Sequence, residues 1–509
     1  GLSAIHKAHL AAALGLDTGR PVLVLTDDDN AANRFAADLR GFSERDIVQL
    51  PSRELVMADV VGVSRGYEQR RLAALDELAE AHFAVASVQA AAQRTMPPEA
   101  LKAAIVSLAT GETAPLDELA QSLTRAGYER CVQVEGTGQF SIRGGILDVF
   151  PPQAEHPYRV EFWDDEIDSI STFDVGSQRR LEQCECLRCL PCMESIPALA
   201  KGGAAGLAKA VLALTSTRRK KQHADLQTNL ERDAERLRET GSLPAADKYM
   251  PLIYPEMATA FDYLPENAIV IIEDTPRLRD AVRDFHARVA DDVTALLERG
   301  EMPPNLGEYA LDFVGVCSVK RQILRLDSFL NNVAELTPQH LENFIANQMN
   351  AYGGNLDMAS ADIRSYTEQG RAVAVVCGSV LRCQNMLDAL TDTGLNVKIS
   401  DLLPKGGCVN IMEGTLSAGF EYPDLGLVVM TEGQVLARRK KTQVKKSNRD
   451  KVKSYTDLTP GDLVVHEHHG IGRFIGMERM TVDGSERDFI KIAFAGTDFL
   501  YVPATSLDL

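Results

Sequence analysis

The sequence predicts a multidomain α/β protein that ends in a small all-β domain. Two stretches alternate helix-like and strand-like segments, a pattern typical of open, mostly parallel α/β sheets. A strand-rich stretch interrupts the first of them, and residues 458–509 hold only short strands and turns. With 509 residues, the chain can form roughly three to five domains, each with its own core.

The first α/β stretch begins the chain. Residues 4–14 and 30–39 predict helices, and residues 21–25 form an apolar run of strand length. Residues 70–79 predict a further helix, and residues 83–87 predict the next strand. Strands separated by helices favour a mostly parallel sheet.

The same alternation returns later in the chain. Apolar residues recur at helical spacing from Leu226 to Leu237, with charged residues on the other helix face, and residues 269–272 restore a strand. From residue 325 to 433 a further α/β unit is expected. Its strands are predicted at residues 372–376, 409–412 and 427–430, and its helix at residues 380–390.

The strand-rich stretch covers residues 98–192. Side chains alternate in residues 158–163, so Arg159 and Trp163 should share the face opposite the buried one. Arg143, on a neighbouring strand, is also predicted to point outward. Exposed aromatic and arginine side chains are typical of interface centres. The alternative is that a neighbouring domain covers Trp163 and that the arginines form local ion pairs.

Residues 458–509 predict a small β domain. Val464–Val465 and Phe474–Ile475 fall in separate strands. Asp483–Gly484 is a strong signal for a two-residue hairpin, because such a turn needs positive φ. Residues 490–494 then alternate apolar and other side chains, which indicates a half-buried strand.

The sequence contains no phosphate-binding loop of the G-x-x-x-x-G-K-[ST] type. Such a loop needs the lysine charge for the phosphates and the hydroxyl for magnesium. Neither Gly-Lys-Ser nor Gly-Lys-Thr occurs in the chain. We therefore expect no ATP hydrolysis, no catalytic residue and no cofactor in these residues.

Four cysteines lie close together at Cys184, Cys186, Cys189 and Cys192. Four thiolates could hold zinc or an iron–sulfur cluster. The usual zinc arrangement separates two C-x-x-C pairs by a longer loop, so a strand without metal is favoured. The histidines of residues 466–469 are interpreted as part of a turn rather than as metal ligands.

The overall charge is strongly acidic. A net charge of -18 disfavours non-specific nucleic-acid binding by the chain as a whole. Between Arg438 and Lys453, however, nine basic residues accompany one acid, Asp450. This segment is interpreted as a solvated linker, and a weak contact to DNA is the alternative.

Composition and the chain ends indicate a cytoplasmic protein. No apolar run reaches the length of about eighteen residues that a membrane helix needs, and no signal peptide is seen. The nine cysteines are expected to stay reduced. The first residue, Gly1 rather than Met, suggests a fragment.

The strand-rich stretch also carries a specific motif. The pattern G-x-F-x-x-R-G-x-x-x-D-x-F-P, followed by Y-R-x-E-F-x-x-D-E-I-D-S, resembles the UvrB homology module of the transcription-repair coupling factors, the Mfd family. The segments GLSAIHKAHLAAAL and PSRELVMADVVGVSRGYEQRRLAAL resemble that family's degenerate phosphate loop and a segment of UvrB. The resemblance implies one UvrB-like domain formed by residues 1–97 and 193–324, with residues 98–192 inserted in it.

In that family the inserted domain binds the excision-repair protein UvrA. By motif alignment, Arg143 and Arg159 fall on the family's two interface arginines. Trp163 falls on its interface aromatic, where a Phe is usual. The resemblance therefore predicts a UvrA-binding site at these three residues.

Residues 457–509 resemble the RNA polymerase interaction domain that the family shares with CarD-type regulators. The segments VVHEHHGIGRFIGM and LYVPATSLDL carry this resemblance, which implies an SH3/Tudor-like barrel that binds the polymerase β subunit. A polymerase contact should be apolar and exposed. Met480, aligned with a contact leucine of the family, is the first candidate, although it could instead fill the barrel core; Ile475 is the second.

The resemblance predicts an adaptor for transcription-coupled DNA repair, monomeric, with a small α/β domain at residues 325–433 and a basic linker at residues 434–456. ATP, magnesium and most DNA contacts would belong to a motor outside these residues. The alternatives are a UvrB-type damage-verifying ATPase and a CarD-like transcription regulator.

Overall fold

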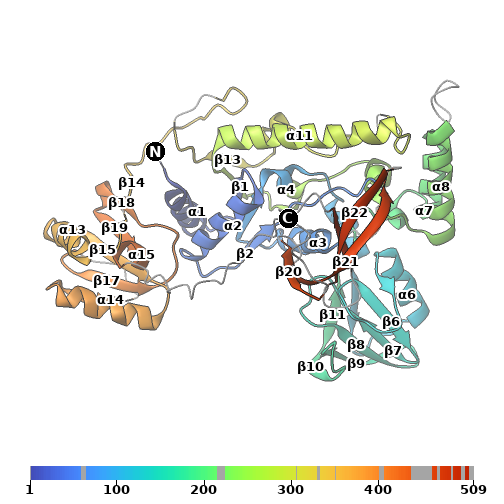
Figure 1. Cartoon of the computed structure of the whole chain (residues 1–509), viewed down its shortest axis with the longest axis horizontal. Coiled ribbons are helices and arrows are strands. Elements are labelled where there is room, and N and C mark those ends of the chain that lie inside the picture. Colours follow the sequence, from blue (N-terminus) through green and yellow to red (C-terminus); the bar gives the residue numbers. More distant parts are fainter. Residues whose placement is uncertain are drawn as a thin grey trace. The chain divides into compact units, whose positions relative to one another are not determined.

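The computed structural model divides into two compact units, residues 1–436 and 437–509 (Figure 1). The residues that the structure describes are 2–58, 65–214, 224–304, 306–329, 333–349, 351–400, 406–436, 461–466, 470–482, 485–493 and 499–503.

The first sheet of the larger unit is parallel and has the strand order β13-β12-β1-β3-β2. Its strands are β1 (Val22–Thr26), β2 (Ile47–Leu50), β3 (Phe83–Ser87), β12 (Ile269–Ile272) and β13 (Gln322–Arg325). The predicted parallel sheet is confirmed. The strand β1 pairs with β3, which precedes the strand-rich stretch in the sequence, and with β12, which follows it. The two parts of the chain that flank this stretch therefore form one sheet.

Helices cover both faces of this sheet. Val22 and Val24 pack on α1 (Ala4–Thr18) and α2 (Asp29–Arg40), whereas Leu23 and Leu25 pack into the core on the opposite face. Alternate strand residues therefore reach different helix layers. The other helices of this domain are α3 (Gly66–Glu77), α4 (Val88–Ala92), α5 (Pro98–Ala104), α7 (Gly203–Ala213), α8 (Ala224–Thr240), α9 (Met250–Ile253), α10 (Ala260–Tyr263), α11 (Thr275–Glu298) and α12 (Phe313–Cys317).

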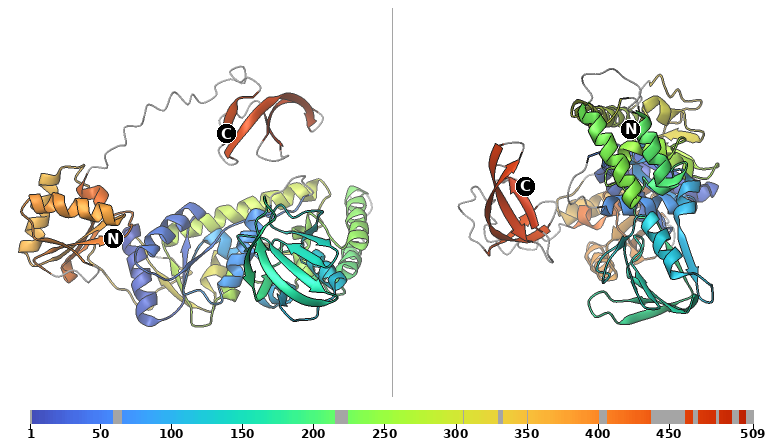
Figure 2. Two further views of the ribbon diagram at one scale, coloured as in Figure 1. Left: turned by 90° about the horizontal axis from the view of Figure 1, so that it is seen from below. Right: turned by 90° about the vertical axis from the view of Figure 1, so that its right-hand side faces the viewer.

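Between β3 and β12 the chain forms a separate strand-rich domain (teal in Figure 2). Its main sheet has the order β10-β9-β8-β7-β6-β5 and is antiparallel except for the β5–β6 pair. The strands are β5 (Glu129–Arg130), β6 (Gln139–Arg143), β7 (Ile146–Val149), β8 (Tyr158–Trp163), β9 (Glu166–Phe173) and β10 (Arg180–Cys184). A two-stranded sheet of β4 (Val106–Ala109) and β11 (Cys186–Cys189), together with α6 (Leu116–Arg125), completes the core.

A third sheet occupies the last part of the larger unit, with the order β14-β18-β19-β15-β17-β16. Its elements are β14 (Asn347–Gln348), α13 (Leu356–Glu368), β15 (Ala372–Cys377), α14 (Val380–Asp392), β16 (Val397–Ile399), β17 (Val409–Glu413), β18 (Phe420–Tyr422), β19 (Leu427–Thr431) and α15 (Glu432–Val435). The strands β15, β16, β17 and β19 run parallel, β18 pairs antiparallel with β19, and β14 pairs antiparallel with β18.

This third sheet packs directly on the first α/β domain. Asp38 of α2 accepts hydrogen bonds from Ser417 N and Oγ at 2.8 and 2.7 Å. His9 of α1 lies against Phe420 and Tyr422 of β18, and its Nδ1 is 3.1 Å from the Tyr422 hydroxyl. A small apolar and aromatic core therefore joins the two domains.

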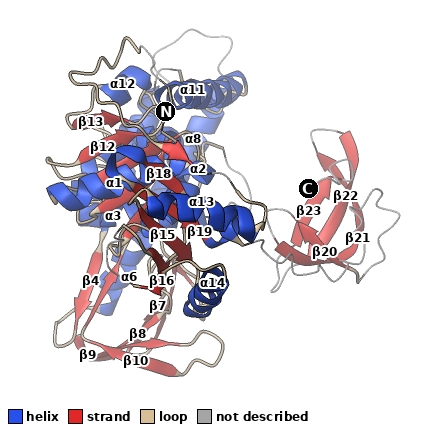
Figure 3. Ribbon diagram, turned by 90° about the vertical axis from the view of Figure 1, so that its left-hand side faces the viewer, coloured by secondary structure: helices blue, strands red, loops and turns tan. Residues whose placement is uncertain are grey.

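The smaller unit contains a four-stranded antiparallel sheet with the order β20-β21-β22-β23 (Figure 3). The strands are β20 (Leu463–His466), β21 (Gly470–Val482), β22 (Ser485–Ala493) and β23 (Phe499–Pro503). Val482 pairs with Ser485, and the predicted hairpin residues between them lie outside the described residues. Among the residues that the structure does describe, β20 is not paired with β23, so closure into a barrel stays a prediction.

A mixed α/β protein with several sheets is thus confirmed, while the predicted domain limits stay predictions. The basic segment at 438–453 lies outside the described residues. Every helix within the described part of the chain is too short or too polar to cross a membrane.

Candidate functional site

The main sheet of the inserted domain has one apolar and one polar face. Asp148 of β7 lies opposite Ser141 of β6 and opposite Arg159 of β8. Opposite residues of paired strands share a face, and so do alternate residues along a strand. Arg143 and Trp163 therefore belong to this same face, which we call the outer face. The structure brings all three predicted UvrA-binding residues to it.

Asp148 joins the two arginines. Arg143 Nη2 lies 2.6 Å from Asp148 Oδ2. Arg159 places Nε 2.7 Å from Asp148 Oδ1 and Nη2 2.9 Å from Oδ2. The Asp148 side chain is 1% exposed, whereas those of Arg159 and Arg143 are 15% and 47% exposed. One buried carboxylate thus anchors a covered arginine and a half-exposed one.

Arg159 is held by further contacts. Its guanidinium lies 4.5 Å from the centre of the Phe173 ring, and Nη2 is 3.1 Å from Gln178 Oε1. The hydrogen bond to Asp148 raises the pKa of Arg159, against the lowering effect of burial. The side chain is therefore fixed, charged and largely enclosed.

Trp163 lies at the end of β8, where the chain turns into β9. It pairs with Glu166, and Asp164 in the turn has a φ of 59°. Aspartate tolerates this left-handed conformation better than most residues. The turn lifts the indole into solvent, and Trp163 is 81% exposed. A large exposed aromatic side chain on the same sheet face as an arginine pair has the composition of a protein-binding surface.

Asp148 was not among the residues assigned from the sequence. The signal available was a single acid between Leu147 and Val149 in an otherwise apolar strand. Its pairing partners lie on the neighbouring strands β6 and β8. Only the register of those strands shows that the carboxylate reaches both arginines.

The smaller unit offers a second candidate surface. Ile475 lies at an irregularity in the pairing of β21 with β22 and is 42% exposed, while its neighbour Phe474 is buried. Met480 lies on β21 opposite Arg487 of β22, but its side chain lies outside the described part of the structure. Both sites therefore stay predictions.

The four clustered cysteines all have free thiols. Burial raises the pKa of Cys189 to about 12 and also raises the pKa of Cys192. Metal ligation needs thiolates, which such burial disfavours. Among the described residues, no group of three or more His, Cys, Asp or Glu is arranged to hold a metal ion.

A small cavity lies at the carboxyl ends of β1 and β12, the edge at which open α/β sheets bind ligands. Its volume is about 160 Å³, and Lys7, Asp27, Glu273 and Arg277 contribute to its lining. Lys7 Nζ donates a hydrogen bond of 2.6 Å to the Glu273 carbonyl oxygen. The cavity is smaller than the roughly 300–1,000 Å³ typical of small-molecule sites.

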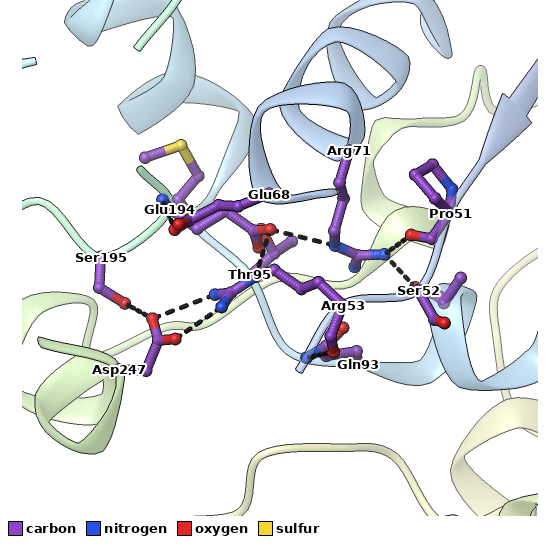
Figure 4. Close-up of polar contacts among 12 residues, drawn as sticks. Pro51, Ser52, Arg53, Glu68, Arg71, Gln93, Thr95, Glu194, Ser195 and Asp247 are labelled. Atoms are coloured by element: carbon purple, nitrogen blue, oxygen red, sulfur yellow. Dashed lines mark hydrogen bonds and ion pairs between the residues drawn. The ribbon is translucent and has the colours of Figure 1, made fainter. Parts of the chain in front are cut away.

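A second cluster of arginines and carboxylates is linked by the polar contacts drawn in Figure 4, and its side chains are buried. Arg53 places Nε 2.7 Å from Glu194 Oε1 and Nη1 2.6 Å from Asp247 Oδ2. Arg71 Nε lies 3.2 Å from the same Glu194 oxygen, and Glu68 Oε1 accepts a 2.7 Å hydrogen bond from the Glu194 backbone. We call these five residues the buried cluster. It connects Arg53, which follows β2, and helix α3 to Glu194, which follows the last strand of the inserted domain.

The buried cluster holds its charges by mutual compensation. Burial alone would raise the pKa of Asp247, but the Arg53 charge and the hydrogen bonds from Arg53 and Ser195 lower it. Burial raises the pKa of Glu68. Every member is buried, although Arg53 and Glu68 also line a cavity of about 1030 Å³. Its contacts between separate parts of the chain give the cluster the character of a structural support.

Two segments of the chain match known families. Residues 106–194 match the UvrB interaction domain, which includes the outer face. Residues 458–509 match the CarD-like/TRCF RID domain, which includes all four strands of the smaller unit. The whole chain is similar to the transcription-repair-coupling factor of Bacillus subtilis (strain 168), with 31% identity.

The comparisons confirm the predicted resemblance to the transcription-repair coupling factors. The chain is also 27% identical to the transcription-repair-coupling factor of Staphylococcus haemolyticus (strain JCSC1435) and 26% identical to that of Staphylococcus aureus (strain USA300). Each alignment covers 100% of this chain and 44% of the relative. The chain therefore spans less than half the length of these transcription-repair coupling factors.

Proposed function

We propose that this chain is the adaptor part of a transcription-repair coupling factor, which binds RNA polymerase through the smaller unit and UvrA through the inserted domain. The observation that carries this proposal is the presence of a UvrB interaction domain and a CarD-like/TRCF RID domain in one chain. A protein with both surfaces can bring excision repair to a stalled polymerase.

The outer face is the surface proposed for UvrA. Arg143 supplies N–H donors to solvent, and Trp163 supplies an exposed apolar anchor. Arginine and tryptophan are enriched among residues that dominate interface energies. In a binding measurement with purified UvrA and no ATP, the chain should bind, and Arg143→Ala with Arg159→Ala should bind more weakly. Equal binding by this double variant would refute the site.

The smaller unit is proposed to bind the polymerase β subunit as an SH3/Tudor-like barrel. Ile475 supplies exposed apolar surface on β21, and Met480 lies further along the same strand. Met480→Arg would place a charge in the apolar centre of such an interface, where charges are depleted. We expect the variant to lose β-subunit binding, and unchanged affinity would remove Met480 from the contact.

This part of the chain is not expected to hydrolyse ATP. The phosphate-binding motif is absent from the sequence. We expect ATP and magnesium to act in a motor outside these residues. An ATPase assay on the chain tests the rival assignment as a UvrB-type damage-verifying enzyme, because that assignment requires measurable turnover.

The remaining expectations follow from the adaptor role. A cytoplasmic monomer suits a protein that meets polymerase and UvrA, and the basic segment at residues 434–456 could add a weak contact to DNA. A CarD-like regulator would share polymerase binding but would have no need of UvrA. Binding of UvrA therefore separates the two functions.

A further inference from the structure

We propose that Asp148 is the positioning residue of the UvrA-binding face. It holds Arg143 and Arg159 in the arrangement that presents the half-exposed guanidinium to carboxylates of the partner. This inference rests on the proposed UvrA function and deepens it, because it assigns a role to a residue that would not itself touch the partner.

The first argument is the use of both carboxylate oxygens. Oδ1 accepts from Arg159 Nε, and Oδ2 accepts from Nη2 of both arginines at 2.6 and 2.9 Å. Arg159 is bound through two parallel N–H···O bonds, the geometry that fixes a guanidinium plane best. Arg143 shares an oxygen with that fixed group, so its position follows from the position of Asp148.

The second argument is electrostatic. Two guanidinium groups on one carboxylate oxygen lie close together and repel each other unless a negative charge lies between them. Asp148 supplies that charge from a buried position on β7. Without it, we expect the half-exposed Arg143 to move into solvent. Within the described residues, Asp148 is the one partner that holds the Arg143 side chain by a hydrogen bond or an ion pair.

The third argument concerns what the face can recognise. A guanidinium has five N–H donors, and Arg143 directs Nη2 to Asp148 while 47% of its side chain stays exposed. The remaining donors suit a carboxylate, which binds a planar guanidinium with two parallel hydrogen bonds. Trp163, on the same face, suits an apolar pocket. The partner surface is therefore expected to combine acidic side chains with an apolar pocket.

Preorganisation explains why the anchor should matter for affinity. An arginine that is free in solution loses side-chain entropy when a partner orders it, and this loss weakens binding. Asp148 orders the two arginines before the partner arrives. Its removal should weaken binding even though Asp148 lies beneath the arginines rather than at the partner.

The sign of the charge effect makes the inference testable. Asp148→Asn removes a negative charge, so the outer face becomes more positive. If only long-range charge mattered, the variant would bind an acidic partner more tightly. Positioning predicts the opposite result, namely weaker binding.

The experiment measures affinity of the whole chain for purified UvrA by calorimetry. Asp148→Asn should bind about tenfold more weakly, as expected when charge-assisted hydrogen bonds are lost. Asp168→Asn, a matched charge removal at an exposed position of β9, should bind like the wild-type chain. Added to Arg143→Ala with Arg159→Ala, Asp148→Asn should have no further effect, because the groups it positions are already gone.

Folding is followed in the same samples. Far-ultraviolet circular dichroism and thermal unfolding of each variant report whether the chain keeps its fold. If Asp148→Asn unfolds this domain, Asp148→Glu takes its place; it keeps the charge, displaces the carboxylate and should also weaken binding. Wild-type or tighter affinity of the folded variant would overturn the positioning role. Failure of the wild-type chain to bind UvrA would instead refute the proposed function itself.

Discussion

Within the described residues, two clusters of arginines around buried carboxylates can be compared, and they differ in exposure rather than in chemistry. In the buried cluster, Arg53 and Arg71 share Glu194, and all of these side chains are enclosed. On the outer face, Arg143 and Arg159 share Asp148, and one arginine reaches solvent. The same ion-pair geometry can therefore serve either to join parts of a fold or to present a charge to a partner.

The difference teaches how to assign a role to such a cluster. A buried ion pair pays a desolvation cost that its attraction roughly offsets, so its presence alone says little about stability. Removing one partner, however, leaves an uncompensated buried charge. At the outer face, water can solvate a guanidinium released from its carboxylate. We therefore expect substitutions in the buried cluster to affect folding, and substitutions at the exposed members of the outer face, Arg143 and Trp163, to affect binding.

The largest expected effect comes from Arg53→Met. It leaves Glu194 and Asp247 facing each other without the cation between them, which should cost about 3–5 kcal/mol of stability. Chemical denaturation, followed by circular dichroism, measures the loss. A change below about 1 kcal/mol would show that the buried cluster relaxes without its central arginine.

The control for this prediction is Arg188→Met. Arg188 pairs with Asp76 at a half-exposed position, where ion pairs contribute roughly 0–1 kcal/mol. If Arg188→Met lowers the stability as much as Arg53→Met does, burial of the ion pair does not determine the loss of stability.

The next effect should appear in binding. Trp163→Ala removes the exposed aromatic anchor and should cost about 2 kcal/mol or more of affinity for UvrA, as interface tryptophans commonly do. Thermal unfolding should stay unchanged, because the indole is 81% exposed. Leu381→Ala, at a 71% exposed position on α14 of another domain, is the matched control and should bind normally. A lowered melting temperature for Trp163→Ala would indicate that Trp163 stabilises the fold rather than binding a partner.

A smaller effect is expected at the second surface. Ile475→Arg should weaken binding to the polymerase β subunit by about tenfold, because a charge would enter an apolar contact. Binding to UvrA should not change, since residue 475 belongs to the other compact unit. A variant that loses both activities would indicate general misfolding rather than a contact.

The sequence predicted one of the two clusters much better than the other. Alternation along β8 placed Arg159 and Trp163 on one face, because side-chain direction in a strand is a local property. The resemblance to the coupling factors supplied their proposed role. Asp148 was missed because its contact with Arg159 depends on the pairing of β7 with β8.

The buried cluster had no local signal at all. Arg53, Glu194 and Asp247 come from separate parts of the chain and meet only when the inserted domain returns to the first sheet. Strand and helix positions were easier to predict: β3 and β12 match the expected residues, because uninterrupted apolar runs mark strands buried on both faces. The short strand β2 at Ile47–Leu50 was not predicted.

The smallest expected effect uses pH to separate the buried cluster from another enclosed polar contact. Burial lowers the pKa of His6 and His9, where α1 packs on Phe420 and Tyr422. A lowered folded-state pKa means that the unfolded chain takes up protons first. Stability from this contact is therefore complete above the ordinary pKa of 6.5 and declines as the pH falls below it.

Asp247 in the buried cluster behaves differently, because its lowered pKa keeps its contribution intact until the pH falls below the ordinary value of 3.8. Between pH 7.5 and 5.5, hydrogen exchange should therefore speed up at α1 and β18 but not around Asp247. His9→Gln keeps a polar group beside Tyr422 without a titrating ring, so it should reduce this pH dependence. If hydrogen exchange speeds up in both regions together, the two contacts belong to one cooperative unit. The different pKa shifts of the histidines and of Asp247 would then not separate them.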